Sequence, residues 1–175
     1  EQVDFCIVGE PTSNRKIGDM IKIGRRGSIN FDITIHGTQG HVAYPDKASN
    51  PITTLVKILN LLIDYEFDEG NENFSATNLE IISVDVGNNV TNLIPADASA
   101  KFNIRFNDEY ASQDIIKLIE YTLEKCSGKY TMNYRVSGES FLSKKSSYAR
   151  MVDDAIVEVT GIKTEFSTSG GTSDA

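Results

Sequence analysis

The sequence predicts an α+β domain in which two helices cover one face of a four-stranded antiparallel sheet. Two segments, near residues 29–36 and 101–106, alternate apolar and polar residues as half-buried strands do. Two other segments, beginning near residues 51 and 112, place apolar residues at helical spacing. Between residues 28 and 135 the elements follow the order strand, helix, strand, strand, helix, strand, which is typical of a ferredoxin-like arrangement.

The strands are predicted from apolar residues at every second position. The first strand has four apolar residues on one face, namely Ile29, Phe31, Ile33 and Ile35. Phe102, Ile104 and Phe106 repeat this pattern later in the chain. The segment from Leu79 to Val86 is also strand-like, but its alternation changes phase near Ile81 and Ile82, which indicates a β-bulge.

The helices are predicted from caps and apolar stripes. Ser49-Asn50-Pro51 offers a cap and a first-turn proline, and it precedes the stripe Ile52, Leu55, Val56, Leu59, Leu62 and Ile63. We expect Ser112 to cap a second helix, whose stripe is Ile115, Ile116, Ile119 and Leu123.

The flanking segments predict parts of a second domain that the first domain interrupts. Asp4–Gly9 is an apolar run that ends near Pro11, as expected for a strand buried on both faces. A third helical stripe runs from Tyr148 to Val159 and precedes a polar Ser, Thr and Gly segment. We therefore divide the chain into residues 1–26, 27–138 and 139–175, with the middle unit inserted between two pieces of the other domain.

Composition excludes some classes of partner. The formal net charge is −8, and the chain has no run of Lys and Arg, so a phosphate backbone or an anionic membrane surface is not an expected partner. The two cysteines, Cys6 and Cys126, are expected to be reduced thiols, which favours the cytoplasm. The apolar stretches are shorter than a membrane span, and the first residues do not resemble a signal peptide.

Glu10 and His41 are the candidates for metal and proton chemistry. Glu10 directly follows the predicted buried strand, where open α/β sheets place ligand sites, whereas the alternative is a solvated turn residue. His41 lies in a Gly-containing turn and could polarise a carbonyl, whereas the alternative is a surface histidine. His36 and His41 do not have the spacing of a metal-binding pair, and no Gly-x-Ser-x-Gly elbow is present.

Basic and small residues suggest an anion site. Arg25, Arg26 and Arg105 could form hydrogen-bonded pairs with substrate carboxylates, although exposed arginines are common. The segment Ser169-Gly170-Gly171-Thr172-Ser173 could offer N–H groups and hydroxyls to an anion, or it could be an ordinary turn.

Six motifs in order resemble one family. They are Cys6-Ile7-Val8-Gly9-Glu10-Pro11-Thr12, Gly24-Arg25-Arg26-Gly27-Ser28, Gly40-His41-Val42-Ala43-Tyr44-Pro45, Asn92-Leu93-Ile94-Pro95, Phe102-Asn103-Ile104-Arg105-Phe106 and Ser169-Gly170-Gly171-Thr172-Ser173-Asp174. Together they span nearly the whole chain. They resemble the co-catalytic metallopeptidase family that includes desuccinylases, acetylornithine deacetylase and related carboxypeptidases.

The resemblance implies a homodimer of two-domain subunits. In each subunit an α/β catalytic domain that binds two Zn²⁺ or Co²⁺ ions is interrupted by a smaller dimerisation and lid domain. Glu10 is then a metal ligand, and His41 reaches the partner subunit's site to stabilise an oxyanion. Family positions for substrate recognition are Arg25, Tyr44, Asn92, Arg105, Ser137, Gly171 and Thr172. Thr91 stands where the family usually has a second asparagine, which puts one substrate contact in doubt.

The implied reaction is hydrolysis of N-succinyl-LL-2,6-diaminopimelate to succinate and LL-2,6-diaminopimelate, in lysine biosynthesis. The family's His-x-Asp motif, bridging Asp, Glu-Glu pair and late metal-binding His do not occur in these 175 residues. We therefore expect the chain alone to hold no metal pair and to be inactive. The alternatives are a non-catalytic dimerisation module of a related deacylase and a generic α+β binding domain.

Overall fold

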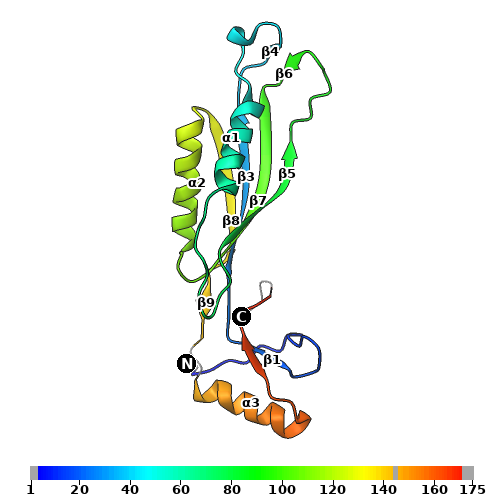
Figure 1. Ribbon diagram of the computed structural model, residues 1–175, viewed down its shortest axis with the longest axis vertical. Coiled ribbons are helices and arrows are strands. Elements are labelled where there is room, and N and C mark those ends of the chain that lie inside the picture. Colours follow the sequence, from blue (N-terminus) through cyan, green and yellow to red (C-terminus); the bar gives the residue numbers. More distant parts are fainter. Residues whose placement is uncertain (1–3, 144–145, 171–175) are drawn as a thin grey trace.

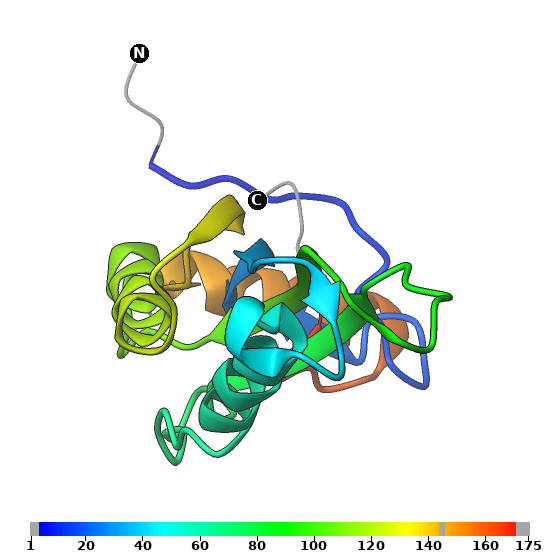
Figure 2. The ribbon, with the colours of Figure 1, turned by 90° about the horizontal axis from the view of Figure 1, so that it is seen from above.

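The main unit is a four-stranded antiparallel sheet with two helices on one face. The computed structural model describes residues 4–143 and 146–170. The strands are β3 (Gly27–His36), β5 (Asn78–Asp85), β7 (Asp97–Phe106) and β8 (Tyr130–Gly138), in the spatial order β5-β7-β3-β8. Helices α1 (Pro51–Ile63) and α2 (Ser112–Cys126) lie on the same side of this sheet (Figures 1 and 2). The predicted ferredoxin-like arrangement is confirmed.

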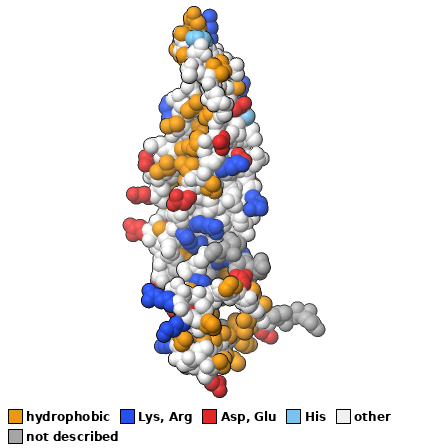
Figure 3. All heavy atoms as spheres, turned by 90° about the vertical axis from the view of Figure 1, so that its right-hand side faces the viewer, with side chains coloured by type: hydrophobic (Ala, Val, Ile, Leu, Met, Phe, Trp, Pro, Cys, Tyr) orange, Lys and Arg blue, Asp and Glu red, His pale blue; other side chains and the backbone are white. Residues whose placement is uncertain are grey.

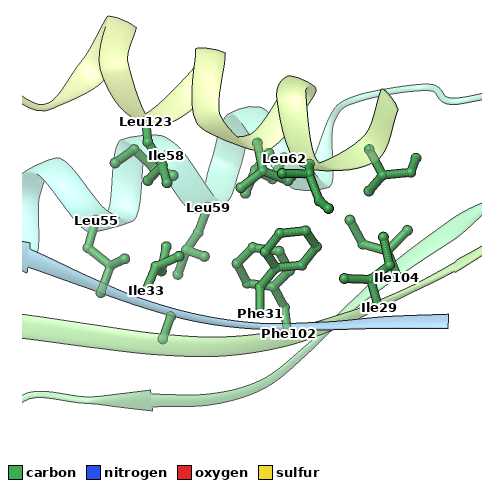
Figure 4. Packing of buried hydrophobic residues seen from close by; sticks show 14 of the residues in the cluster. Ile29, Phe31, Ile33, Leu55, Ile58, Leu59, Leu62, Phe102, Ile104 and Leu123 are labelled. Carbon is green, nitrogen blue, oxygen red and sulfur yellow. The ribbon is translucent and has the colours of Figure 1, made fainter. Parts of the chain in front are cut away.

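The core lies between this sheet and the two helices. Ile29, Phe31, Ile33 and Ile35 all point to the helix side of β3 and are at most 2% exposed. The ring of Phe31 stacks on that of Phe102 across the strand pair, with centroids 5.0 Å apart (Figure 4). Residues from α1 and α2 close the other side of the core, among them Leu55, Ile58, Leu59, Leu62 and Leu123. The opposite face of the sheet has no helix over it among the described residues.

Local signals explain both helix starts, with one correction. Asn50 caps α1, because its Oδ1 accepts a hydrogen bond from the Ile52 N–H at 3.0 Å, as predicted. The predicted cap at Ser112 is wrong by one residue, since Ala111 is the N-cap of α2. Asp114 Oδ2 accepts from the Ala111 N–H at 3.1 Å, and Glu139 Oε2 accepts from the Ser112 N–H at 3.0 Å. These two carboxylates take the place of a capping hydroxyl.

The predicted bulge in β5 is confirmed. Ile81 pairs with Phe102 and Ser83 with Lys101, which leaves Ile82 as an extra residue without a partner on β7. Ile82 is 64% exposed. The change of phase in the apolar pattern therefore marks the position where β5 gains one residue.

A smaller unit at the other end contains residues from both ends of the chain (Figure 1). Here β1 (Met20–Lys22) runs parallel to β10 (Glu165–Ser167), and β2 (Gly24–Arg25) pairs with β9 (Phe141–Leu142). Helix α3 (Ser147–Thr160) matches the third predicted stripe, and its C-cap is Gly161, whose φ of +71° suits a glycine. Within the described residues, no helix is long and apolar enough to cross a membrane.

The predicted strand at Asp4–Gly9 is wrong. Residues 5–13 belong to no helix or sheet, and Phe5, Ile7 and Val8 are exposed. A strand needs a neighbour for its N–H and C=O groups, and none of the described strands pairs with this segment. The apolar run predicts a buried segment, whereas these side chains are exposed in the structure.

Candidate functional site

His41, Tyr44 and Asn92 meet at the tip of the sheet that lies farthest from α3; we call them the tip cluster. The tip is built from β4 (Gly40–His41), the 3₁₀-helix η1 (Pro45–Lys47) and β6 (Leu93–Ile94). His41 pairs with Leu93, and the Val42 N–H donates to the Asn92 carbonyl at 3.0 Å. These bonds hold the loop that carries His41 against the loop that carries Asn92 (Figure 1).

Hydrogen bonds orient the His41 ring. Its Nδ1 accepts from the Ala43 N–H at 3.0 Å, so the neutral ring carries its proton on Nε2. Nε2 lies 3.4 Å from Asn92 Nδ2, which is a contact between two donors in this tautomer, and the Tyr44 ring lies 5.8 Å from the imidazole. All three side chains are exposed. The imidazole therefore presents an N–H donor at the surface.

Arginines form a second group at the opposite end of the sheet; we call Arg25, Arg26 and Arg105 the arginine row. One row of paired residues crosses all four strands, through Gly138, Ser28, Arg105 and Asn78. These four positions face away from the helices, because their neighbours Ile104 and Phe106 point into the core. The Arg25 guanidinium lies against Gly138, where a Cβ atom would be 2.8 Å from Nη2. Arg26 Nη1 donates to Asn78 Oδ1 at 2.8 Å and to the Ala76 carbonyl at 3.2 Å.

The arginine row concentrates positive charge. Burial lowers the pKa of Arg26, and repulsion from Arg105 lowers it further. Such a strip of planar donors suits carboxylates, which arginine binds with two parallel hydrogen bonds.

Ser137 lies beside this row. Ser28 pairs with Gly138 and Ile29 with Val136, so Ser137 is the extra residue of a bulge in β8. Its Oγ accepts from Asn30 Nδ2 at 3.2 Å. The fold thus brings together three of the predicted substrate residues, Arg25, Arg105 and Ser137.

Lys22 is a candidate that sequence reasoning missed. Its Nζ donates to Ser169 Oγ at 2.8 Å, and Ser169 Oγ is also 2.8 Å from Ser167 Oγ. Burial lowers the pKa of Lys22, while the negative charge of Glu165 acts in the opposite direction. A single lysine in a three-residue strand carries no sequence pattern. The predicted substrate residues Gly171 and Thr172 follow this segment and lie outside the described residues.

Glu10 does not form a metal centre with its neighbours in the described part of the chain. It is half-buried in the segment that precedes β1, and its N–H donates to the Val8 carbonyl at 3.2 Å. Across residues 4–143 and 146–170, no group of three or more His, Cys, Asp and Glu side chains is placed to hold a metal ion. Zinc takes about four ligands, so these residues alone do not fit a zinc pair.

The two histidines belong to separate groups of interacting side chains. His36 Nδ1 lies 2.6 Å from Asp97 Oδ1, and its Nε2 lies 2.8 Å from Thr131 Oγ1. These are cross-strand contacts on the face of the sheet without helices. His41 has a separate set of partners in the tip cluster.

The tip cluster and the arginine row do not meet within one chain. They lie at opposite ends of β3, whose ten residues span about 30 Å at about 3.3 Å per residue. A small substrate cannot contact both groups on the same chain. The predicted site residues therefore form two separate sets.

Comparisons with known proteins identify the family. Residues 23–131 match the peptidase dimerisation domain. The chain is 53% identical over 174 residues to the succinyl-diaminopimelate desuccinylase of Orientia tsutsugamushi (strain Boryong), covering 99% of this chain and 45% of that protein. It is 49% identical over 179 residues to the protein of the same name from Pelagibacter ubique, covering 100% and 47%. The chain thus spans just under half the length of these relatives.

Solved structures share the fold. Aminopeptidase PepT from Bacillus cereus aligns with a TM-score of 0.74 at 19% identity, over 93% of this chain and 43% of that one. An M20 family metallo-carboxypeptidase from Sulfolobus solfataricus aligns with a TM-score of 0.73 at 15% identity, over 89% and 55%. These findings confirm the resemblance predicted from the six motifs. With more than half of its residues matched, the chain belongs to the peptidase dimerisation domain family.

Proposed function

We propose that the full-length protein is a metal-dependent amide hydrolase that cleaves N-succinyl-LL-2,6-diaminopimelate to succinate and LL-2,6-diaminopimelate, as part of lysine biosynthesis. The observation that carries this proposal is the identity of 49–53%, along almost the whole chain, to proteins named succinyl-diaminopimelate desuccinylase. Identity at this level extends well beyond the residues that form the core.

The arginine row supports an anionic substrate. Arg25 and Arg105 present guanidinium groups on the sheet face without helices, and Ser137 adds a hydroxyl beside them. We assign all three to the binding of substrate carboxylates, together with Gly171 and Thr172. Tyr44 and Asn92 complete the proposed set, supplied by the tip cluster of the partner subunit.

We assign His41 to the active site of a partner subunit. Its Nε2–H is a donor suited to an oxyanion that forms on the amide carbonyl during hydrolysis. Because His41 is about 30 Å from the arginine row of its own chain, an arrangement between two subunits explains why one reaction needs both groups. The tip projects beyond the end of the sheet, which is the position that His41 needs to reach the active site of a partner subunit (Figure 1).

A second copy of the chain is the proposed partner. Strand β5 is an edge of the sheet, and Ile82 and Val84 on it are 64% and 53% exposed. Helix α1, which packs over β7 and β3, exposes Val56 and Ile63. Figure 3 shows hydrophobic side chains along this side of the molecule. We propose that this edge and the exposed side of α1 form the dimer interface, since apolar residues on an open edge favour self-association.

Residues 27–138 are proposed as the dimerisation and lid domain, and residues 1–26 and 139–175 as parts of the catalytic domain. The four-stranded sheet begins at Gly27 and ends at Gly138, which supports these boundaries. In α3 only Ala149 is buried, while Met151 and Val159 are 64% and 85% exposed. These apolar side chains are available to pack against the additional length that the relatives have.

The catalytic domain is proposed to bind two Zn²⁺ or Co²⁺ ions. Bound metals would polarise the amide carbonyl and activate a water molecule. Glu10 would supply one carboxylate ligand, and the remaining ligands would come from residues outside this chain. We place the protein in the cytoplasm, because Cys6 and Cys126 are both free thiols.

The test is an assay of the full-length protein with Zn²⁺ or Co²⁺ on two substrates, N-succinyl-LL-2,6-diaminopimelate and N-acetylornithine. We expect turnover of the first and at least about a hundredfold lower kcat/KM on the second, because only the first offers the arginine row the carboxylate of a succinyl group. Turnover of N-acetylornithine alone would replace the proposal with a deacetylase, of which this chain would be the dimerisation module.

A further inference from the structure

Two asparagines form a hydrogen-bonded chain across three strands, next to the arginine row. Asn103 on β7 directs its Nδ2 at three oxygens: the Ile29 carbonyl at 3.0 Å, Asn30 Oδ1 at 3.0 Å and Ser28 Oγ at 3.1 Å. A backbone carbonyl can only accept a hydrogen bond. The Ile29 carbonyl therefore fixes which end of the Asn103 amide is the nitrogen.

The orientation of Asn103 sets that of Asn30. Since Asn103 Nδ2 is a donor, the Asn30 atom that faces it must be the oxygen. The Asn30 amide nitrogen is then the atom that lies 3.2 Å from Ser137 Oγ, and it donates to this oxygen. The chain of bonds thus runs in one direction, from β7 through β3 to β8.

This direction determines what the Ser137 hydroxyl can do. Its oxygen already accepts a hydrogen bond from Asn30, so its own proton can be donated elsewhere. Ser137 is the exposed residue of the β8 bulge, and the next residue, Gly138, lies against the Arg25 guanidinium. A hydroxyl donor therefore stands beside a cationic group.

We propose that Asn103 and Asn30 are positioning residues that hold the Ser137 hydroxyl as a donor to a carboxylate of the substrate. The inference rests on the proposed function for the substrate but names two residues outside the predicted site. An anion needs donors only, and an undirected serine hydroxyl presents its oxygen as readily as its proton. The two asparagines occupy one of the two lone pairs of Ser137 Oγ before the substrate binds, which favours donation of the hydroxyl proton to the substrate and binding by preorganisation.

The decisive variant is Asn30→Asp, tested in the full-length enzyme on N-succinyl-LL-2,6-diaminopimelate. Both oxygens of the introduced carboxylate would be acceptors, so one would still take the bond from Asn103 while the other took the Ser137 proton. We expect KM to rise about tenfold and kcat to change less than about twofold, because the lost contact stabilises the bound substrate and the transition state equally.

Two further variants separate this effect from the added charge. In a Ser137→Ala background, Asn30→Asp should raise KM no more than Asn133→Asp does in the wild type. Asn133 is exposed on the same face of β8 and supplies the matched negative charge. The inference is overturned if Asn30→Asp raises KM equally with and without Ser137, or no more than Asn133→Asp does. A wild-type enzyme that does not hydrolyse this substrate would instead overturn the proposed function.

A readout without catalysis tests the direction of the bonds in the 175-residue chain itself. In ¹H–¹⁵N spectra, the side-chain NH₂ protons of Asn30 and Asn103 should exchange slowly with solvent. Ser137→Ala should shift the Asn30 NH₂ signals and leave those of Asn103 nearly unchanged. Rapidly exchanging NH₂ protons at both asparagines would contradict this chain of hydrogen bonds, whatever the enzyme's activity.

Discussion

The guanidinium of Arg25 lies against Gly138, so close that a Cβ atom at this glycine would stand 2.8 Å from Arg25 Nη2. Gly138 pairs with Ser28 at the end of the sheet that carries the arginine row. The absence of a side chain at residue 138 is therefore what allows Arg25 to lie over the sheet. It links a backbone position in β8 to the anion recognition that we propose for Arg25.

Gly138→Ala should displace Arg25 with little loss of stability. The atom that meets the new methyl group is the end of a flexible side chain, so it can move, but it then leaves its position in the arginine row. We expect KM for the succinylated substrate to rise about tenfold in steady-state assays of the full-length enzyme. Gly128→Ala is the matched control, since nothing lies within 4 Å of a Cβ atom there. Equal KM values for the two variants would contradict the role given to Gly138.

Asp68→Asn should destabilise the loop between α1 and β5. Burial raises the pKa of Asp68, but hydrogen bonds from Thr77, Gly70 and Asn107 outweigh this effect, so its pKa lies below the usual value of 3.8. At neutral pH we expect a loss of about 1 kcal/mol in the free energy of unfolding, because the loop is partly open to solvent. Urea unfolding followed by circular dichroism measures it, with the exposed neighbour Glu69→Gln as control.

The contribution of Asp68 should depend on pH in one direction. A carboxyl whose pKa is lower in the folded state stabilises the fold above its unfolded pKa, here 3.8, and loses this effect as pH falls through the folded pKa. The difference in unfolding free energy between wild type and Asp68→Asn should therefore be constant above about pH 5 and shrink below about pH 4. A difference that grows on acidification would show that the carboxylate is not the stabilising form.

Phe102→Ala should remove much of the stability of the main unit. Phe102 is fully buried and stacks on Phe31 at 5.0 Å, so its loss leaves a cavity under both helices. We expect a decrease of about 3–5 kcal/mol in the free energy of unfolding of the 175-residue chain. Val159→Ala, at an 85% exposed position, should change it by less than about 0.5 kcal/mol. Similar losses of unfolding free energy for both variants would show that Phe102 is not a core residue.

Val84→Lys should convert a dimer of this chain into monomers. A charged side chain on the β5 edge would be buried without a partner if that edge forms the interface. Sedimentation equilibrium at micromolar concentration should give a mass near 38.6 kDa for the wild type, twice 19.3 kDa, and near 19.3 kDa for the variant. Val159→Lys makes the same substitution on α3 and should leave the dimer intact. A variant that sediments like the wild type would rule out this edge.

Local patterns predicted the main unit because its elements depend on neighbours in sequence. The alternation from Ile29 to Ile35, the Asn50 cap and the phase change at Ile82 each reflect a short stretch of backbone. The strand predicted at Asp4–Gly9 failed for the opposite reason, since a buried strand requires partners that the apolar run itself does not reveal.

The arrangement of the site could not be predicted from motifs alone. The motifs named Arg25 and Arg105, and the resemblance added Ser137, but cross-strand register decides that they converge, and register is a long-range property. The contacts of Asn30 with Asn103 and Ser137 join residues 73 and 107 positions apart. The separation of His41 from the arginine row likewise follows from the length of β3.

Whether His41 acts in the partner subunit's site can be measured by combining two full-length variants, each expected to be inactive by itself, in one dimer. One carries His41→Ala and the other Glu10→Ala, and the two are co-expressed with different affinity tags. In a mixed dimer, the metal site of the first subunit receives an intact His41 from the second, so activity should recover to about a quarter of the wild-type value in an equal mixture. Activity no greater than that of the two separate variants would show that His41 does not act across the dimer.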